Sequence, residues 1–288
     1  MSRDKIVSIV VDSAASLPCD FNSIKMIQVV PMKLVIGSES FRDGIDIDIS
    51  DLYKSKHQLG THTTTSAPSP MDYMDAFKKA AEYSTSILCI TVSSHFSASY
   101  KSAMLAADKA SDEIESTRVL VLDSGSAAGG QGLVVTRAHN SAQSGHDLDH
   151  VVSVAKNVIN QVSLVAFLDS LYHVWKSGRV PGLVYFGTSI LDIKPMFELR
   201  QGRIRNIGRP RTYNRASKRL IEIIRSSVRD APGPLHASVM HAGDPDGADR
   251  IREDLRNEFE IEELFISEFS AVMGLHTGPG LVGVAYWV

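Results

Sequence analysis

Short apolar segments that end in polar turns constrain this chain most, because they predict strands that are buried on both faces. Residues 86–92 are almost entirely apolar, and residues 5–11 are rich in β-branched side chains. Such segments are typical of parallel strands that helices cover on both sides. A helical pattern over about 98–114, a strand over 118–122 and another helix follow. This alternation predicts an N-terminal α/β domain with a mostly parallel sheet and flanking helices.

The second half of the chain has a different pattern. The segments 193–199 and 203–208 flank Gln201-Gly202, which is typical of an antiparallel hairpin. The other elements expected there are strands over 236–240, 264–267 and 281–288 and a helix over 248–259. We therefore predict a C-terminal mixed or antiparallel sheet with helices. Since the composition changes near residues 150–165, we predict two α/β domains, 1–160 and 161–288.

The composition indicates an ordered protein without a membrane span. Of the 288 residues, 43% are hydrophobic and 22% are charged, which is enough apolar surface for two cores and too little charge for disorder. No apolar segment approaches the roughly 20 residues of a membrane span, and the first is too short for a signal peptide. The two cysteines, Cys19 and Cys89, form no metal-binding motif. We expect a cytoplasmic protein with reduced cysteines, no metal and no cofactor.

The charges are distributed unevenly along the chain. Residues 176–225 contain 12 Lys and Arg against 3 Asp and Glu, although the whole chain has a net charge of −3. Within this basic segment Arg203, Arg205, Arg209 and Arg211 all have odd numbers, so an extended strand would project them from one side. We interpret this face, together with Arg179, as a docking surface for an anionic partner. The alternative is ordinary solvated charge.

Hydroxyl side chains gather at two expected turns. The segment 63–70, Thr-Thr-Thr-Ser-Ala-Pro-Ser-Pro, precedes a helical pattern, and Ser69-Pro70-Met71-Asp72 has the form of a capping box at the helix N-terminus. Its free N–H groups and the hydroxyls of Thr65 or Ser66 are candidates to bind an anion. Ser93-Ser94 follows the apolar strand 86–92, at a strand end where ligands of open α/β sheets collect. Simple helix capping is the alternative at both places.

The segment His276-Thr277-Gly278-Pro279-Gly280 is the most unusual one in the chain. Two glycines around a proline predict a tight turn before the last strand. A histidine that enters such a turn can donate a hydrogen bond to a carboxylate, and a protonated ring would add charge to that bond. A turn that only joins two elements is the alternative.

Other motifs exclude several common functions. The chain has no phosphate-binding P-loop, no GxGxxG after its first strand and no GxSxG nucleophile turn. Residues 43–48 resemble a calcium loop but lack its glycine and terminal glutamate. Asp12-Ser13 and Asp123-Ser124 each follow a strand, and we interpret both as Asx turns rather than as catalytic carboxylates.

Taken in order and spacing, these motifs resemble the DegV family over essentially the whole chain. The resemblance rests on Asp12-Ser13, Thr65-Ser66-Ala67-Pro68-Ser69, Ser93-Ser94, Asp123-Ser124, Lys176-Ser177-Gly178-Arg179, Lys194-Pro195, Arg211-Thr212 and His276-Thr277-Gly278-Pro279-Gly280. Two features differ from the family pattern. His95 stands where the family usually has glycine, and Ala67 stands where glutamine is common.

The resemblance implies a two-domain fold that binds one long-chain fatty acid between the domains. It implies that Thr65, one serine of Ser93-Ser94 and His276 meet the carboxylate, and we add the adjoining Ser66 and Thr277 as candidates. Some members present the carboxylate to a separate ATP-dependent kinase, which forms an acyl-phosphate. Arg179 and Arg211 match the basic positions associated with that kinase.

We expect a non-catalytic lipid-binding subunit with at most transient membrane contact. A serine-dependent hydrolase or acyltransferase that uses His276 is the main alternative. Nucleic-acid binding through the arginine strand is disfavoured, because the chain is acidic overall and no aromatic residues lie between these arginines.

Overall fold

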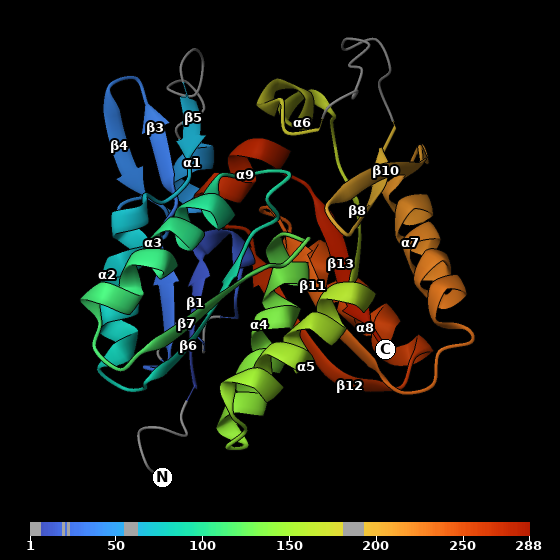
Figure 1. The fold of residues 1–288 in the computed structure, drawn as a ribbon. Helices are drawn as coiled ribbons and strands as arrows, with labels where there is room; N and C mark the ends of the chain where they lie inside the picture. The colour runs from blue at the N-terminus through green and yellow to red at the C-terminus, as the bar shows by residue number, and fades with distance from the viewer. Residues whose placement is uncertain (1–6, 19–20, 22–23, 55–62, 181–192) are drawn as a thin grey trace.

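Two large sheets and one small sheet, covered by helices, organise the chain (Figure 1). The computed structural model describes residues 7–18, 21, 24–54, 63–180 and 193–288. The strands of the first half are β1 (Val7–Asp12), β2 (Ile27–Val30), β3 (Lys33–Ile36), β4 (Glu39–Arg42), β5 (Thr63–Ser66), β6 (Ser86–Thr91) and β7 (Arg118–Asp123). Its helices are the 3-10 turn η2 (Ser13–Ala15), α1 (Ile49–Lys54), α2 (Pro70–Ala81), α3 (Ser99–Glu113), α4 (Ala128–Gln143) and α5 (Leu148–Gln161).

The second half of the chain begins directly after α5, with the strand β8. Its strands are β8 (Ser163–Phe167), β9 (Met196–Arg200), β10 (Arg203–Gly208), β11 (Leu235–His241), β12 (Ile261–Glu268) and β13 (Val282–Trp287). Its helices are α6 (Tyr172–Ser177), α7 (Tyr213–Val228), α8 (Pro245–Glu258) and α9 (Ala271–Thr277).

The predicted parallel sheet is confirmed in the first half. Its strand order is β2-β1-β6-β7, and each neighbouring pair is parallel. Every residue of β1 is buried, as are five of the six residues of β6, including Cys89. Cys19 lies outside the described residues. The apolar runs of the sequence therefore correspond to strands that are covered on both faces.

A small antiparallel sheet, β4-β3-β5, adjoins the parallel one. The β3–β4 hairpin brings together two extended segments that are neighbours in the sequence. Strand β5 pairs with β3 so that Thr65 is opposite Leu34. The hydroxyl-rich segment at 63–66 is thus a strand, and the helix that the capping box predicts begins after it, at Pro70.

The second large sheet is mixed, in agreement with the prediction. Its order is β10-β9-β8-β13-β11-β12, with antiparallel pairs except for the parallel pair β11–β12. The predicted hairpin is β9–β10, and Gln201-Gly202 forms its turn. One expectation is wrong. Strand β10 has a bulge between Asn206 and Gly208 and ends at Gly208, so only Arg203 and Arg205 share a strand, and Arg209 and Arg211 lie beyond it.

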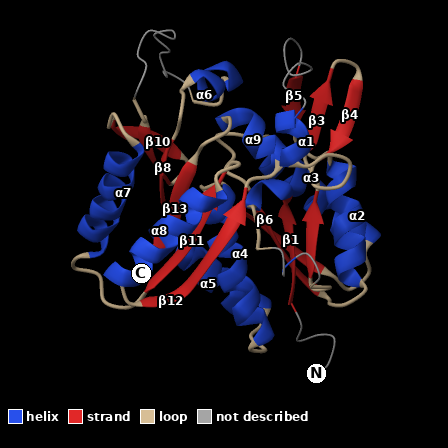
Figure 2. Cartoon of the chain, turned by 180° about the vertical axis from the view of Figure 1, so that it is seen from behind, coloured by secondary structure: helices blue, strands red, loops and turns tan. Residues whose placement is uncertain are grey.

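Helices α4 and α5 form a layer between the two large sheets (Figure 2). Helices α2 and α3 cover the outer face of the parallel sheet, and α7 and α8 cover the outer face of the mixed sheet. The chain changes sheet between β7 and β8, while the division into domains at residue 160 stays a prediction. Among the described residues, no helix is both long and apolar enough to cross a membrane.

Candidate functional site

A cavity of about 890 Å³ lies between the two halves of the chain. Its wall is mainly apolar, and strands of the mixed sheet, β5 of the small sheet, the loop after β6 and helices α4, α6 and α9 contribute to it. Apolar side chains of the wall include Met32, Val92, Leu164, Phe197, Leu199, Ile204, Met240 and Leu281. The polar residues of the wall are Thr65, Ser94, His95, Ser97, Ser177, Arg179, Asn206, His276 and Thr277. Such a lining suits a ligand with a long apolar body and one polar group.

Thr65 and His276 meet at the polar end of this cavity. The Thr65 Oγ1 atom, on β5, lies 2.9 Å from the His276 Nε2 atom, on α9. The two residues are 211 positions apart in the sequence, and the fold alone brings them together. Burial, with a smaller contribution from the nearby Arg179 charge, lowers the pKa of His276 to about 4. The imidazole is therefore neutral at physiological pH, which differs from the protonated ring considered from the sequence.

His276 lies in a helix rather than in the predicted turn. Helix α9 spans Ala271–Thr277, and only Gly278, Pro279 and Gly280 form the connection to β13. The Thr277 hydroxyl lines the cavity wall and donates to the Met273 carbonyl one turn earlier. Because the helix fixes its backbone, the imidazole of His276 is held more firmly than a turn would allow.

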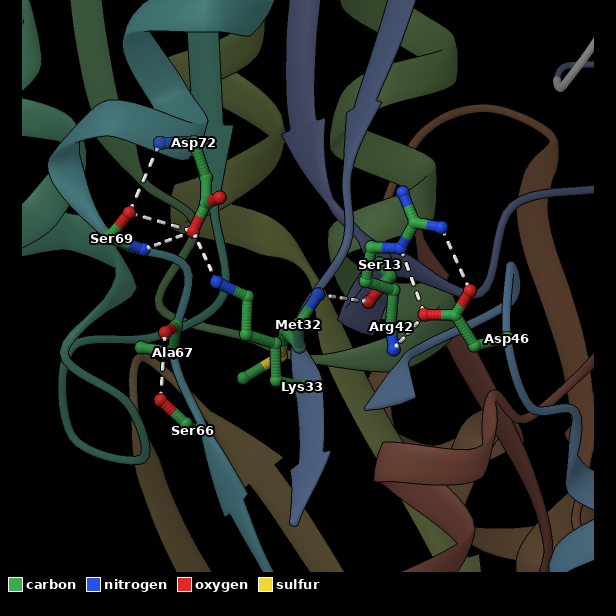
Figure 3. Close-up of polar contacts among 9 residues, drawn as sticks. All are labelled: Ser13, Met32, Lys33, Arg42, Asp46, Ser66, Ala67, Ser69 and Asp72. Atoms are coloured by element: carbon green, nitrogen blue, oxygen red, sulfur yellow. Dashed lines mark hydrogen bonds and ion pairs between the residues drawn. The ribbon is translucent and has the colours of Figure 1, made fainter. Parts of the chain in front are cut away.

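Asp43 fixes the start of α9. One of its carboxylate oxygens accepts the Val272 N–H at 3.1 Å, and the other accepts the Ser13 hydroxyl at 2.7 Å. Ser13 in turn accepts the Met32 N–H at 3.0 Å (Figure 3). Asp43 is buried, so each of these bonds is shielded from water. Thus Asp43 positions His276, a role that the sequence reasoning missed although residues 43–48 had stood out.

The glycines after α9 allow a close approach of the segment after β8. A Cβ atom at Gly278 would lie 2.4 Å from the His173 ring, and one at Gly280 would lie 2.5 Å from the Asp169 carboxyl carbon. Both glycines also have positive φ angles, +75° and +83°. The Gly-Pro-Gly segment is therefore needed for packing against α6 and its N-terminal loop, and this packing encloses the polar end of the cavity.

The serine pair after β6 divides into one buried and one accessible residue. Ser93 is fully buried, and its hydroxyl accepts the His95 N–H at 3.3 Å. Ser94 lines the cavity, and its backbone N–H donates to Asp123 at 3.1 Å. Asp123 also accepts the Gly125 N–H at 2.8 Å, which is the predicted Asx turn. The structure thus brings Ser94, but not Ser93, to the cavity surface.

Asp12 differs from Asp123 although both precede a serine at a strand end. Asp12 is fully buried and accepts the Val92 N–H at 2.8 Å and the Gln131 side-chain amide at 3.1 Å. Burial raises the pKa of this carboxyl to about 6, against the effect of these bonds. Asp12 therefore ties β1 to β6 and α4 beneath the cavity and does not reach its surface.

Ser66 lies outside the cavity wall. The side chains of β5 alternate, so Thr65 is half-buried toward the cavity and Ser66 is exposed. Figure 3 shows the Ser66 hydroxyl donating to the Ala67 carbonyl. The capping box at Ser69 and Asp72 is confirmed, and Asp72 also binds Lys33 at 2.9 Å. The capping box therefore pairs the N–H groups of Ser69 and Asp72, two of the donors that we had considered for an anion.

The basic residues near the site are exposed and dispersed. Arg179 follows α6 and lines the cavity close to His276. Arg205 pairs with Glu198, a buried acid on the neighbouring strand, which the sequence alone had not linked to it. A shallow groove of about 500 Å³ collects further cations from α7 and the loop before it, namely Arg209, Arg215, Lys218 and Arg219. We call these four residues and Arg211 the basic surface.

Comparisons with known proteins decide the family. The family model described as "Uncharacterised protein, DegV family" matches residues 6–288. The chain belongs to the DegV family. A DegV domain-containing protein of Streptomyces coelicolor is 31% identical over 286 residues, which cover 99% of this chain and 98% of that protein.

Solved structures of the DegV family share the whole fold. A DegV family protein from Thermus thermophilus, described as fatty acid binding, matches with a TM-score of 0.88 and 26% identity, over 98% of this chain and 99% of that one. A DegV lipid binding protein from Thermotoga maritima matches with a TM-score of 0.85 and 26% identity, over 98% of each chain. The DegV resemblance seen in the sequence motifs is therefore confirmed for family and fold.

Proposed function

We propose that this protein binds one long-chain fatty acid in the cavity, with the carboxylate at Thr65 and His276. The observation that carries the proposal is this partly buried pair of neutral polar groups in the wall of a mainly apolar cavity. Fatty acid or lipid binding by DegV proteins of Thermus thermophilus and Thermotoga maritima supports it.

The chemistry of the site suits a carboxylate on a long apolar chain. Burial of the tail contributes about 0.8 kcal/mol per methylene, so the apolar wall dominates affinity. Each carboxylate oxygen must still find a donor, because an unpaired buried charge costs several kcal/mol. When the carboxylate takes the place of the bond between Thr65 and His276, these two residues and Ser94 can each supply one hydrogen without adding a permanent positive charge. We retain these three as ligands and omit Ser66 and the buried Ser93.

We further propose that the bound carboxylate is presented to a separate ATP-dependent kinase. Neutral donors hold a carboxylate less tightly than a buried arginine would, so they leave it more reactive toward a phosphoryl group. Arg179 lies beside the polar end, and the basic surface offers an acidic protein a complementary face. In this proposal Arg179, Arg203, Arg209 and Arg211 engage the partner, whereas Arg205 is already paired.

The direct test is mass spectrometry of lipid extracted from the purified protein, followed by titration with fatty acids. We expect near one equivalent of fatty acid per chain. Recovery of non-lipid ligands alone, without uptake of added fatty acid, would contradict the proposal. Acyl-phosphate formation in a reconstituted assay with an ATP-dependent kinase tests the second step separately.

A threonine-dependent acyl transfer is the second candidate, since Thr65 Oγ1 and His276 Nε2 have the spacing of a nucleophile and its base. A base of this kind is normally oriented by a third group, and none of the hydrogen bonds of the described residues joins His276 to a carboxylate. Incubation with an activated ester distinguishes the two functions. An acyl group on Thr65 would favour transfer, and its absence would favour binding.

A further inference from the structure

Helix α9 has one side toward the cavity and another side that is buried against the rest of the chain. The residues of α9 that line the cavity are Val272, Met273, His276 and Thr277. Gly274 is buried and is not part of this wall. Because each residue of a helix is turned by about 100° from the one before, Gly274 and His276 face nearly opposite sides. The Gly274 N–H donates to the Ser270 carbonyl at 2.8 Å, so this part of α9 is regular helix, and a shift at Gly274 also moves His276.

Helix α1 packs against the buried side of α9 (Figure 1). A Cβ atom at Gly274 would lie 2.8 Å from the Ile49 Cδ1 atom and 2.9 Å from the Tyr53 hydroxyl oxygen. Both distances are too short for real atoms, so no side chain fits between the two helices at this position. The lack of a side chain at Gly274 is therefore what allows α1 and α9 to lie together.

The two side chains of α1 have little room to move away from Gly274. Ile49 is buried and belongs to the main hydrophobic core. The ring of Tyr53 also lies against Gly243, in the loop after β11, where a Cβ atom would be 3.3 Å from its Cε2 atom. Its buried hydroxyl has no hydrogen-bond partner in the part of the chain that the structure describes. Packing between two glycines therefore holds the ring of Tyr53 in place.

The segment that holds α9 belongs to the same part of the fold as Thr65. Asp43, in the loop between β4 and α1, accepts the Val272 N–H at 3.1 Å. Strand β3 contacts α9 and pairs with β5, so that Leu34 is opposite Thr65. The small sheet thus carries Thr65, and residues 43–53 hold the helix that carries His276 at two points. Together they determine the 2.9 Å separation of Thr65 Oγ1 and His276 Nε2.

We propose that the contact of α1 with Gly274 positions His276 and thereby makes the site selective for a carboxylate head group. The inference rests on the proposed fatty acid binding and adds the origin of its head-group specificity. A carboxylate has two oxygens and needs the donors of Thr65 and His276 at the same time. The single hydroxyl of a fatty alcohol can pair with either residue alone. A displaced α9 therefore weakens binding of the acid more than binding of the alcohol.

The test compares the dissociation constants of tetradecanoate and tetradecan-1-ol, measured by equilibrium dialysis, for the wild type and Gly274→Ala. The added methyl group pushes α9 away from α1, so the acid should lose one hydrogen bond to its charged group, or about 10- to 150-fold in affinity. The affinity for the alcohol should stay close to that of the wild type. A second measurement is an NMR titration of His276, whose pKa should rise from about 4 toward the usual value of about 6.5 as the ring becomes less buried.

Two further variants serve as control and rescue. Gly132→Ala is the matched control, because Gly132 is also a buried helical glycine, in α4, and its Cβ atom would lie 3.0 Å from the Ala15 carbonyl oxygen. It should keep the wild-type ratio of the two affinities. The triple variant Gly274→Ala, Ile49→Ala and Tyr53→Phe removes the atoms that the new methyl group meets, so it should recover the preference for the acid. Circular dichroism and thermal unfolding establish that each variant is folded.

The outcomes separate this proposal from the function on which it rests. Equal losses for acid and alcohol in folded Gly274→Ala, or no loss for either, would overturn the positioning role of the contact. A wild type without preference for the acid would overturn it as well. A wild type that binds neither compound would instead overturn the proposed function itself. If Gly274→Ala does not fold, Ile49→Val decides: it removes only the methyl group nearest Gly274 and should reduce the preference for the acid, and an unchanged preference would overturn the proposal.

Discussion

The polar end of the cavity and the basic surface both contain residues that the sequence singled out, but their side chains differ in burial. Thr65 and His276 are enclosed, hydrogen-bonded to each other and positioned by a buried carboxylate behind them. The basic surface is exposed, and its arginines and lysine lie on a loop and on one helix. A buried polar group acts through its precise position, whereas an exposed charge acts through its field, which salt screens. We therefore expect changes at the polar end to alter stability and affinity, and changes on the basic surface to alter association rates.

The largest effect is expected for Asp43→Ala. This change leaves the Val272 N–H and the Ser13 hydroxyl without their buried acceptor, at about 1–3 kcal/mol each, so the free energy of unfolding should fall by about 2–6 kcal/mol. Urea denaturation measures this change in the free energy of unfolding. Asp46→Ala is the matched control, because Asp46 is on the same loop but pairs with Arg42 at the surface (Figure 3). Equal losses in both variants would contradict the distinction between buried and exposed carboxylates.

The next effect concerns affinity for fatty acid. Thr65→Ala and His276→Ala each remove one hydrogen bond to a carboxylate, which is worth roughly 1.5–3 kcal/mol, or about 10- to 150-fold in the dissociation constant. Ser66→Ala is the control, since Ser66 is the neighbour of Thr65 on β5 but points away from the cavity. Titration with a fluorescent fatty acid measures all three. A loss in Ser66→Ala as large as that in Thr65→Ala would place the carboxylate elsewhere.

A pH dependence of stability is expected from His276. Its pKa of about 4 in the folded protein lies below the usual value of about 6.5 in the unfolded chain, so the unfolded chain binds more protons in between. Stability is fully present above about pH 6.5 and falls by about 2 kcal/mol between pH 7 and pH 5 through this group. Comparison with His276→Gln isolates the effect, because the other buried acids and histidines are common to both proteins. Parallel stability curves for the two proteins would refute the assignment.

The smallest effect on the ligand is expected from the basic surface. Arg209→Glu and Arg211→Ala should leave fatty acid affinity unchanged but slow association with an acidic kinase, and added salt should weaken association of the wild type. Arg211→Ala should also reduce acyl-phosphate formation. Stopped-flow association and lipid titration on the same variants separate the two quantities. Equal losses in binding and in acyl transfer would place Arg211 at the cavity instead.

The local sequence pattern correctly predicted a segment's structure wherever that structure depends on residues close to it in the sequence. The apolar runs identified β1, β6 and β7, and Gln201-Gly202 identified the β9–β10 hairpin. The capping box at Ser69 was predicted because its partner, Asp72, is only three residues away. The order of the motifs along the chain was enough to predict the DegV family. Each motif lies at a strand end or a turn, and the fold fixes the order of these strand ends and turns.

Several roles depended on contacts between distant segments, and there the sequence misled. The four odd-numbered arginines suggested one strand face, but β10 ends at Gly208, so Arg209 and Arg211 are not part of it. The glycines after His276 suggested a turn, whereas α9 continues through Thr277 because Asp43 and Ser270 fix its start. The contact of Asp43 with Val272 could not be read from the local pattern, because the two residues are 229 positions apart in the sequence.

What the sequence by itself determined is most strands of the two large sheets, the family and the chemical type of the site residues, since periodicity and short motifs are local properties. What only the tertiary structure decided is which of those residues act together. It joins Thr65 to His276 across 211 positions, turns Ser66 away and sets His95 against Gly202. It also gives Asp12 and Asp123 different environments despite the same dipeptide. The physical reason is burial, which depends on packing between distant segments and determines whether a polar group faces water, a ligand or another part of the chain.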